Sequence, residues 1–334
     1  MFYDYQKIYL NSRNPFYESY TTNTDDQRVC YGFWFSEVEY QHTQKKWWLK
    51  DKTVYVSVNG NDLYEPCGAN ESNPCKTVKK AFEMCEVQIS LAITLMKGNH
   101  VSEATTVAIG TKKISVIGKG RAESSIGTGA LSSTGSLFSV STGHLGMSHL
   151  KVDCNSNINP SSPSVVVVSD GGGSLSLEDV VITTSKTGND VMSSSVFVVA
   201  LSQLSMVDVE IKDLNVSKPL FSEPDLSSSS SSSLSSSALY LTATESGDSK
   251  LANVKVMNVK LTEGDGVVVS RNVKAGETFE VKNMTIEDCE CENGSGGGIK
   301  VDLLSPTSKL QVEISTTFNR CACGKYGGGI DVSV

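Results

Sequence analysis

Two pairs of cysteines are the residues of this sequence whose type and spacing most clearly suggest chemistry. Cys289 and Cys291 form one Cys-x-Cys pair, and Cys321 and Cys323 form another, 32 residues further along the chain. Four thiols in two pairs could form disulfides, bind a zinc ion, or remain reduced or pair elsewhere. We favour disulfides between the pairs, because zinc sites usually space their cysteines as Cys-x-x-Cys. Three more disulfide candidates lie nearer the N-terminus: Cys67, Cys75 and Cys85.

Acid–base chemistry has only three candidate residues, Lys300, Asp302 and Asp331. Glycoside hydrolysis needs two carboxyl groups about 5 to 10 Å apart, and a lyase needs a base beside a neutralising cation. We expect these three side chains to form a solvated charged face, so no catalytic residue is assigned. His144 and His149 lie close together in the sequence, and we expect His149 to be a turn residue.

Other ligand-binding signals are few. Aspartates that adjoin Gly or Asn could hold calcium in a turn, but no loop shows the spaced carboxylates of a dedicated site. These aspartates are Asp62, Asp170, Asp190 and Asp265. The glycine runs lack the Lys-Ser/Thr that follows a phosphate-binding loop, so we expect neither a cofactor nor a metal. Four Asn-x-Ser/Thr sequons are candidate N-glycosylation sites: Asn70, Asn215, Asn283 and Asn293.

An eight-residue pattern, apolar-x-apolar-x-x-apolar-x-apolar, surrounds many of these residues and occurs five times between residues 145 and 286. Its copies are Leu145/Met147/Leu150/Val152, Leu175/Leu177/Val180/Ile182, Leu204/Met206/Val209/Ile211, Val254/Val256/Val259/Leu261 and Phe279/Val281/Met284/Ile286. Alternation with period two is typical of a strand with one buried face, and the extra central residue indicates a corner. The corner slot holds residues of types that occur in the left-handed backbone region: His149, Asp179, Asp208, Asn258 and Asn283.

A shorter alternating segment accompanies each copy at steps of about 30 residues, with one step of 42. Its apolar pairs are Phe138/Val140, Val166/Val168, Phe197/Val199, Leu239/Leu241, Val267/Val269, Ile299/Val301 and Ile330/Val332. The long step contains a Ser-rich loop insertion at about 222–237. Together the two segments predict a β-solenoid whose stacked coils place Cys289 next to Cys321 and Lys300 next to Asp331.

The chain divides into two parts. Residues 1–51 form an aromatic-rich segment that holds all three tryptophans, and we expect it to be the end of a preceding domain. Residues 52–334 form the solenoid, which begins with a short capping helix whose apolar face includes Val78, Ala81 and Phe82. No C-terminal cap is visible, so we expect the chain to be a fragment of a longer protein.

Several motifs resemble those of a known family. The segment from Val56-Ser-Val-Asn-Gly-Asn-Asp62 through Asn73-Pro-Cys75-Lys-Thr77 to Ile117-Gly118-Lys-Gly120 is similar to the start of right-handed parallel β-helices of the pectin-lyase-like superfamily. Gly296-Gly-Gly-Ile299 and Gly328-Gly-Ile330 resemble the repeats of polymorphic outer membrane proteins of chlamydiae and of related protist surface proteins. The resemblance implies an all-β, right-handed parallel β-helix of about eight to ten coils. That fold hosts lyases, hydrolases, adhesins and structural shafts.

Composition limits the function. The net charge of −8 over 334 residues argues against nucleic acid or an anionic membrane surface as partner. The sequence contains no apolar run of eighteen residues, so we expect no membrane insertion, and no signal peptide is visible. The paired cysteines favour an extracellular or cell-surface location.

We therefore predict a non-enzymatic surface β-helix with a role in adhesion or surface presentation. Its partners would be host or matrix glycans or proteins. The alternative is a polysaccharide lyase or hydrolase, or a carbohydrate-binding module, on the same fold.

Overall fold

The computed structural model describes the chain from residue 53 to residue 333, apart from several connecting segments. The longest of these segments are 128–136, 154–165, 184–196 and 217–238. The predicted Ser-rich loop and the aromatic-rich residues 1–51 therefore lie outside the described residues, as do Cys85 and Asn293.

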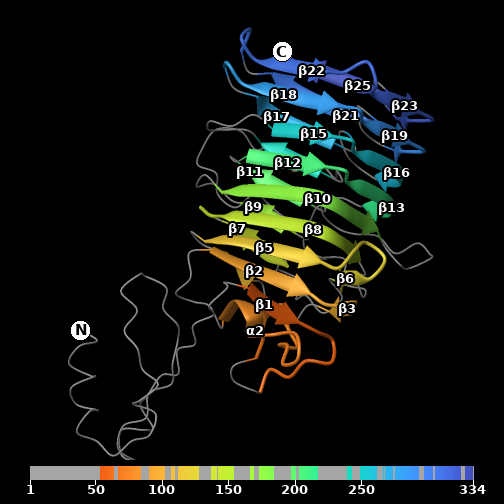
Figure 1. The fold of residues 1–334 in the computed structure, drawn as a ribbon. Coiled ribbons are helices and arrows are strands. Elements are labelled where there is room, and N and C mark those ends of the chain that lie inside the picture. The colour runs from red at the N-terminus through yellow and green to blue at the C-terminus, as the bar shows by residue number, and fades with distance from the viewer. Residues whose placement is uncertain are drawn as a thin grey trace, which may run out of the picture.

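The fold is a parallel β-helix, in which successive coils stack along one axis (Figure 1). Strand pairs are parallel and in register, as where Leu175 pairs with Leu145 on one side and with Leu204 on the other. Two sheets result, one of 17 and one of 8 strands, which we call the large sheet and the small sheet. This confirms the predicted all-β parallel β-helix, whereas its number of coils stays a prediction.

The strands of the large sheet are β1 (Thr53–Val56), β2 (Ser90–Leu95), β3 (Gly98–Val101), β5 (Lys113–Gly118), β6 (Ser124–Gly127), β8 (His144–Asp153), β10 (Ser174–Thr183), β12 (Gln203–Val207), β13 (Glu210–Val216), β15 (Ser249–Ala252), β16 (Lys255–Leu261), β18 (Thr278–Lys282), β19 (Thr285–Glu287), β20 (Glu290–Cys291), β22 (Lys309–Val312), β23 (Thr317–Asn319) and β24 (Ala322–Cys323). The strands of the small sheet are β4 (Val107–Ala108), β7 (Phe138–Val140), β9 (Val166–Val168), β11 (Phe197–Ala200), β14 (Leu239–Thr242), β17 (Val268–Val273), β21 (Ile299–Leu303) and β25 (Ile330–Ser333).

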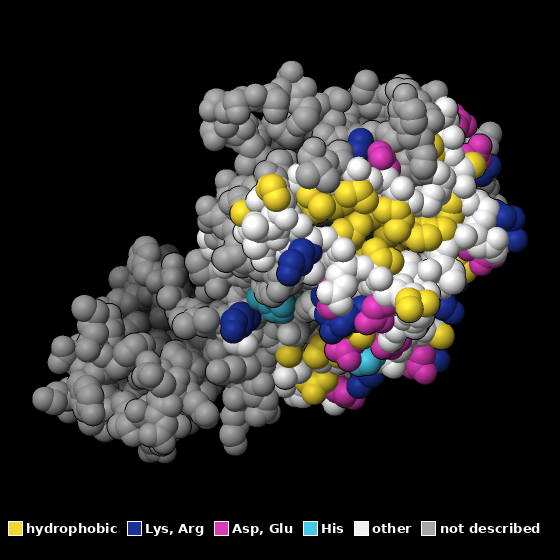
Figure 2. All heavy atoms as spheres, turned by 90° about the horizontal axis from the view of Figure 1, so that it is seen from above, with side chains coloured by type: hydrophobic (Ala, Val, Ile, Leu, Met, Phe, Trp, Pro, Cys, Tyr) yellow, Lys and Arg dark blue, Asp and Glu magenta, His cyan; other side chains and the backbone are white. Residues whose placement is uncertain are grey.

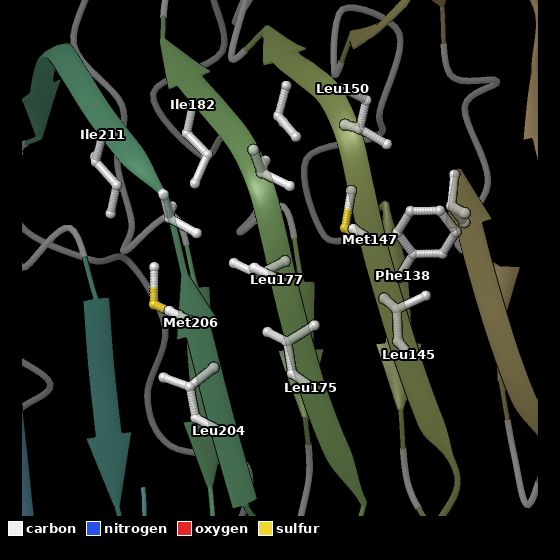
Figure 3. Packing of buried hydrophobic residues seen from close by; sticks show 14 of the residues in the cluster. Phe138, Leu145, Met147, Leu150, Leu175, Leu177, Ile182, Leu204, Met206 and Ile211 are labelled. Atoms are coloured by element: carbon white, nitrogen blue, oxygen red, sulfur yellow. The ribbon is translucent and has the colours of Figure 1, made fainter. Parts of the chain in front are cut away.

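The core is a set of aliphatic columns, because in-register stacking places like side chains on top of one another (Figure 3). Leu145, Leu175 and Leu204 form one such column, and each is at most 1% exposed. Burial of an aliphatic side chain of this size stabilises a fold by about 1.5 to 3 kcal/mol. The columns therefore supply the main stabilisation and fix the register of the coils.

Residues with a positive φ occupy two corners of the large sheet. The first corner stacks His149, Asp179, Asp208, Asn253 and Asn283, and the second stacks Asp213, Asn258, Asp288 and Arg320. The sequence-based prediction that Asn258 shares the corner of Asp208 and Asn283 is therefore wrong. Asn253 occupies that position at the first corner. Both corners produce the same eight-residue pattern, since each puts one left-handed residue between two inward-facing ones. The copy that starts at Val254 consequently stacks on Val209 to Val216 rather than on Leu204 to Ile211.

In the small sheet, the sequence also predicted the wrong set of inward-facing residues for one strand, β17. The sequence predicted Val267 and Val269 to face inward, but Val268 is 0% exposed and lies in register with Leu239 and Ile299. Residues 267–269 are all valine, so alternation could not determine which of them is buried.

A single short helix, α2 (Val78–Glu83), lies among the described residues near β1 and β2 (Figure 1). Val78 and Ala81 are buried, and Phe82 packs against the core, as the predicted apolar face requires. Thr77 accepts a hydrogen bond from the Lys80 amide, and the Asp62 carboxylate accepts bonds from the Lys76 and Thr77 amides. The capping role of this helix stays a prediction. It is too short to cross a membrane, and no membrane-spanning helix occurs in the described part of the chain.

Candidate functional site

The predicted charged group lies on the outer face of the small sheet, at its last two strands. Lys300 on β21 is in register with Asp331 on β25, and Asp302 lies two residues along the same strand as Lys300. The register partners of Lys300 in the earlier coils are, in order along the stack, Ser139, Val167, Val198, Tyr240 and Val269. The structure thus brings the three candidates together.

The corrected register of β17 adds one residue that the sequence prediction missed. Arg271 is the register partner of Thr242. Its strand, β17, pairs with β21, which carries Lys300 and Asp302. The sequence could not predict this pairing, because the register of the residues that follow depends on which valine of the run 267–269 is buried.

A second charged cluster, centred on Arg121, lies at the first corner of the large sheet. The Arg121 guanidinium forms ion pairs with Asp179, at 2.5 Å, and with Glu210, at 4.0 Å. It also donates a hydrogen bond to the backbone carbonyl of Asp208. His149 Nδ1 lies 2.8 Å from the other Asp179 oxygen. One side chain thereby joins corner residues of two successive coils.

The electrostatics of this cluster favour a fixed negative charge. The hydrogen bond with His149, together with the positive charge of Arg121, holds the pKa of Asp179 below its usual value despite partial burial. A carboxyl group that stays ionised is poorly suited to act as a general acid near neutral pH. The arrangement is therefore a structural clamp between coils rather than an acid–base pair.

A network of neutral polar groups surrounds His144 on the outer face of the large sheet. His144 Nδ1 lies 2.8 Å from Ser174 Oγ, and His144 Nε2 lies 3.1 Å from Ser176 Oγ. Burial, with the nearby charge of Lys113, lowers the pKa of His144, so the imidazole is neutral at pH 7. Both nitrogens of the imidazole ring therefore contact hydroxyl groups of the same adjacent strand, β10.

Gly146 is buried within this network. A Cβ atom at Gly146 would lie 3.3 Å from Ser176 Oγ and 3.6 Å from both His144 Nε2 and Ser115 Oγ. Polar atoms from three strands thus converge around Gly146. The signal for this cluster was in the sequence, as small and hydroxyl residues at the outward positions of the eight-residue pattern.

The His144–Ser176 pair does not have the surroundings of a serine nucleophile. Its orienting partner is the Ser174 hydroxyl, whereas the established triads use a carboxylate or amide. The strands around it hydrogen-bond their backbone amides to neighbouring strands, so those amides cannot form an oxyanion hole. These groups are better placed to bind a ligand than to attack one.

The predicted disulfides between the cysteine pairs are absent. Cys291 and Cys323 are in-register neighbours, as expected, but all four cysteines are thiols. In-register residues of parallel strands point the same way, so their Cβ atoms stay about 4.8 Å apart, beyond the usual disulfide range of about 3.5 to 4.5 Å. Burial raises the pKa of Cys289 to about 12, so its thiol is protonated and unreactive.

The N-terminal cysteines do form a disulfide. Cys67 and Cys75 are bonded across a loop of sequence separation 8, with Cα atoms 4.7 Å apart. The Asp62 carboxylate lies close to both sulfur atoms. Disulfide sulfurs are poor metal ligands, and Asp62 already accepts hydrogen bonds from Lys76 and Thr77, so this group is not a metal site. The other aspartates proposed for calcium, at 170, 190 and 265, lie outside the described residues.

Two of the sequons have clear structural roles. The Asn283 side chain donates to Asn253 Oδ1 at 2.8 Å and occupies a corner. Asn70 is exposed, and its side-chain oxygen accepts bonds from the Ser72 and Asn73 amides. Asn215 is partly exposed on β13, in register with Lys260. Glycosylation at these positions stays a prediction.

Comparison with known proteins adds little to this description. No protein-family model and no curated protein matches the chain. A solved structure, endo-xylogalacturonan hydrolase from Aspergillus tubingensis, is similar with a TM-score of 0.29 and 11% identity, over 84% of this chain and 95% of that one. A likeness this low carries no argument about function. The resemblance to chlamydial and protist surface proteins has no support in these comparisons.

Proposed function

We propose that this chain is a non-enzymatic, extracellular or cell-surface β-helix that takes part in adhesion by binding a glycan around His144. The observation that carries the proposal is the convergence of Ser115, His144 and Ser176 around Gly146. Hydroxyl groups and a neutral imidazole both donate and accept hydrogen bonds, which suits the hydroxyl groups of a sugar. An anion would need donors alone.

The direction of the sheet supports an extended ligand. Ser115, Gly146, Ser176 and Ser205 are successive register partners across β5, β8, β10 and β12. Parallel strands repeat at about 4.8 Å, so polar groups recur along the axis. A polymer that lies across the coils would meet the same chemistry at several points.

The test is binding of the 334-residue chain to arrays of glycans and matrix proteins. His144→Ala and Ser176→Ala each remove a hydrogen-bonding group from this cluster, and we expect each to weaken glycan binding about tenfold. Ser125→Ala is the matched control, because its hydroxyl lies on the same sheet but bonds to Asn99 instead. Failure to bind any glycan, or equal loss in the control, would refute the proposal.

A polysaccharide hydrolase or lyase is the second candidate, and the placement of Lys300, Asp302 and Asp331 on adjacent strands favours it. These three residues would supply one cation and two carboxylates on one face of the small sheet. The two candidates differ in one observable, since an enzyme converts its polysaccharide whereas a binding face does not.

A further inference from the structure

The hydrogen bonds around His144 change when its imidazole gains a proton. His144 Nδ1 lies 2.8 Å from Ser174 Oγ, and His144 Nε2 lies 3.1 Å from Ser176 Oγ. A neutral imidazole has one donor nitrogen and one acceptor nitrogen, so one of these hydroxyl groups must donate its hydrogen to the ring. The other hydroxyl accepts from the ring, and its hydrogen is free to bond to a ligand.

A protonated imidazole donates hydrogen bonds from both of its nitrogens. Ser174 and Ser176 then both accept from the ring, so the hydrogens of both hydroxyl groups become available to a ligand. Leu145 and Leu175 point into the core, so these alternating neighbours lie on the outer face of the sheet. The same side chains thereby offer hydrogen-bond donors and a positive charge, which suits the oxygen atoms of an anion.

The charged groups closest to His144 are cations. Lys113 on β5 is exposed and is the register partner of His144, so their Cα atoms are about 4.8 Å apart. Burial and the charge of Lys113 lower the pKa of His144. Lys112, whose carbonyl accepts a hydrogen bond from the His144 amide, directs its ammonium group over the Phe82 ring. Because two neighbouring cations repel each other, an anion bound beside both is favoured once His144 is charged.

Among the described residues, carboxylates lie farther from His144. Glu178 lies four residues along β10 from Ser174, the register partner of His144, which is a distance of about 13 Å. Asp153 lies at the other end of β8 beside Lys151, and β6 pairs only with that end. Figure 2 shows acidic side chains mainly on one side of the described part, whereas a histidine lies on the other side next to basic side chains. A proton on His144 is therefore not neutralised by a nearby carboxylate.

We infer that protonation of His144 switches this cluster from binding the hydroxyl groups of neutral sugars to binding anionic groups such as sulfate esters. The inference rests on the proposed glycan site and adds its regulation by pH. At neutral pH the cluster offers mixed donors and acceptors. In acid it offers donors and two adjacent positive charges, which an anion complements.

Binding of dextran sulfate to the full chain tests this switch, with unsulfated dextran as the neutral probe. The pKa of His144 is first measured by NMR titration of the imidazole, and binding is then measured about one pH unit above and below it. Sulfate esters stay ionised throughout, and the protonated fraction of His144 changes about tenfold. We therefore expect dextran sulfate to bind about tenfold more tightly at the lower pH, and dextran to show no such gain.

Two variants separate His144 from the general effect of acid on the net charge. His144→Gln keeps a polar side chain that does not titrate, so it should lose the gain at low pH. His149→Gln is the matched control, because it removes the other histidine of β8, which bonds to Asp179 at the corner. It should keep the gain, and circular dichroism at each pH establishes that the variants are folded.

Two further measurements test the switch without comparing affinities between pH values. His144→Lys places a permanent positive charge beside Lys113, so it should bind dextran sulfate more tightly than the wild-type chain at neutral pH. Saturating dextran sulfate should also raise the measured pKa of His144, because a ligand that prefers the protonated form must favour protonation in return.

The inference is overturned if dextran sulfate does not bind below the pKa of His144, or binds equally above and below it. An equal gain in folded His144→Gln, or an unchanged pKa of His144 in the presence of dextran sulfate, would also overturn it. The proposed function fails on a different result, namely that no glycan binds at neutral pH. The two failures are therefore distinguishable.

Discussion

Arg121 shows how a single side chain can stabilise a stack of coils. It lies in the turn between β5 and β6 and reaches Asp179 and the Asp208 carbonyl, 58 and 87 residues further along the chain. The Arg121 side chain is 32% exposed, so water screens its charge only in part. Isolated surface ion pairs such as Lys119–Glu71, with side chains 43% and 55% exposed, contribute little by comparison.

The lowered pKa of Asp179 predicts a pH dependence of stability. The pKa of Asp179 in the folded state lies below the ordinary aspartate value of 3.8, so the stabilisation is fully present above that pH and is lost as the pH falls through the folded-state pKa. In Asp179→Asn this loss should be smaller, because no carboxylate remains to be protonated. Urea unfolding between pH 6 and pH 2 measures the free energy of unfolding. Glu71→Gln is the control and should follow the wild-type profile, whereas an identical profile in Asp179→Asn would contradict the assignment.

The thiol of Cys289 should resist alkylation in the native chain. Its pKa of about 12 leaves almost no thiolate at pH 8, and the side chain is fully buried. Iodoacetamide labelling followed by mass spectrometry should modify Cys289 only after unfolding, and the partly exposed Cys323 before it. A disulfide between Cys289 and Cys321 in the native protein would instead contradict the structure and restore the prediction made from the sequence.

At the scale of elements, the corners decide the path of the chain. Asn258 has φ of 51° and donates to Asp213 Oδ1 at 2.9 Å. Similar bonds link Asn253 to Asp208 and Asn283 to Asn253, so polar side chains connect the coils outside as the aliphatic columns do inside. Asx residues suit these slots, because they tolerate the left-handed region and bond to the next coil.

Substitutions at Asn258 separate the backbone contribution from the side-chain contribution. Asn258→Gly keeps the left-handed backbone and loses only the hydrogen bond, so we expect a loss of about 1 kcal/mol or less in the free energy of unfolding. Asn258→Val places a β-branched residue in that region and should cost about 2 kcal/mol. Chemical denaturation measures both, with Lys255→Val at an exposed position of β16 as control. Equal losses in the Gly and Val variants would show that the backbone conformation is not the cause.

Apolar periodicity made much of the large sheet predictable. The columns through Leu145, Leu175 and Leu204 follow directly from it. Apolar periodicity failed at Asn258, because both corners of the coil produce the same sequence pattern. It also failed at residues 267–269, because three valines in a row show no alternation. The Arg121 cluster was not predictable, because its partners come together only through the stacking of coils that are far apart in sequence.

At the scale of the whole molecule, the β-helix presents different chemistry on its different surfaces. Its large sheet carries neutral hydroxyl groups around His144, and its first corner carries the Arg121 clamp. Described carboxylates with shifted pKa values, Asp179 and Asp288, are both shifted downward by cationic or imidazole partners. These ionised groups hold successive coils together.

Turnover is the measurement that tests the non-enzymatic account most directly. The full chain should be incubated with pectin, alginate and glycosaminoglycans, with reducing ends and unsaturated products as the readouts. We predict product formation no greater than that of Lys300→Ala and Asp302→Ala, together with glycan binding that depends on His144. Turnover by the wild-type chain that either of these variants abolishes would contradict it and would assign the face of β21 and β25 as an active site.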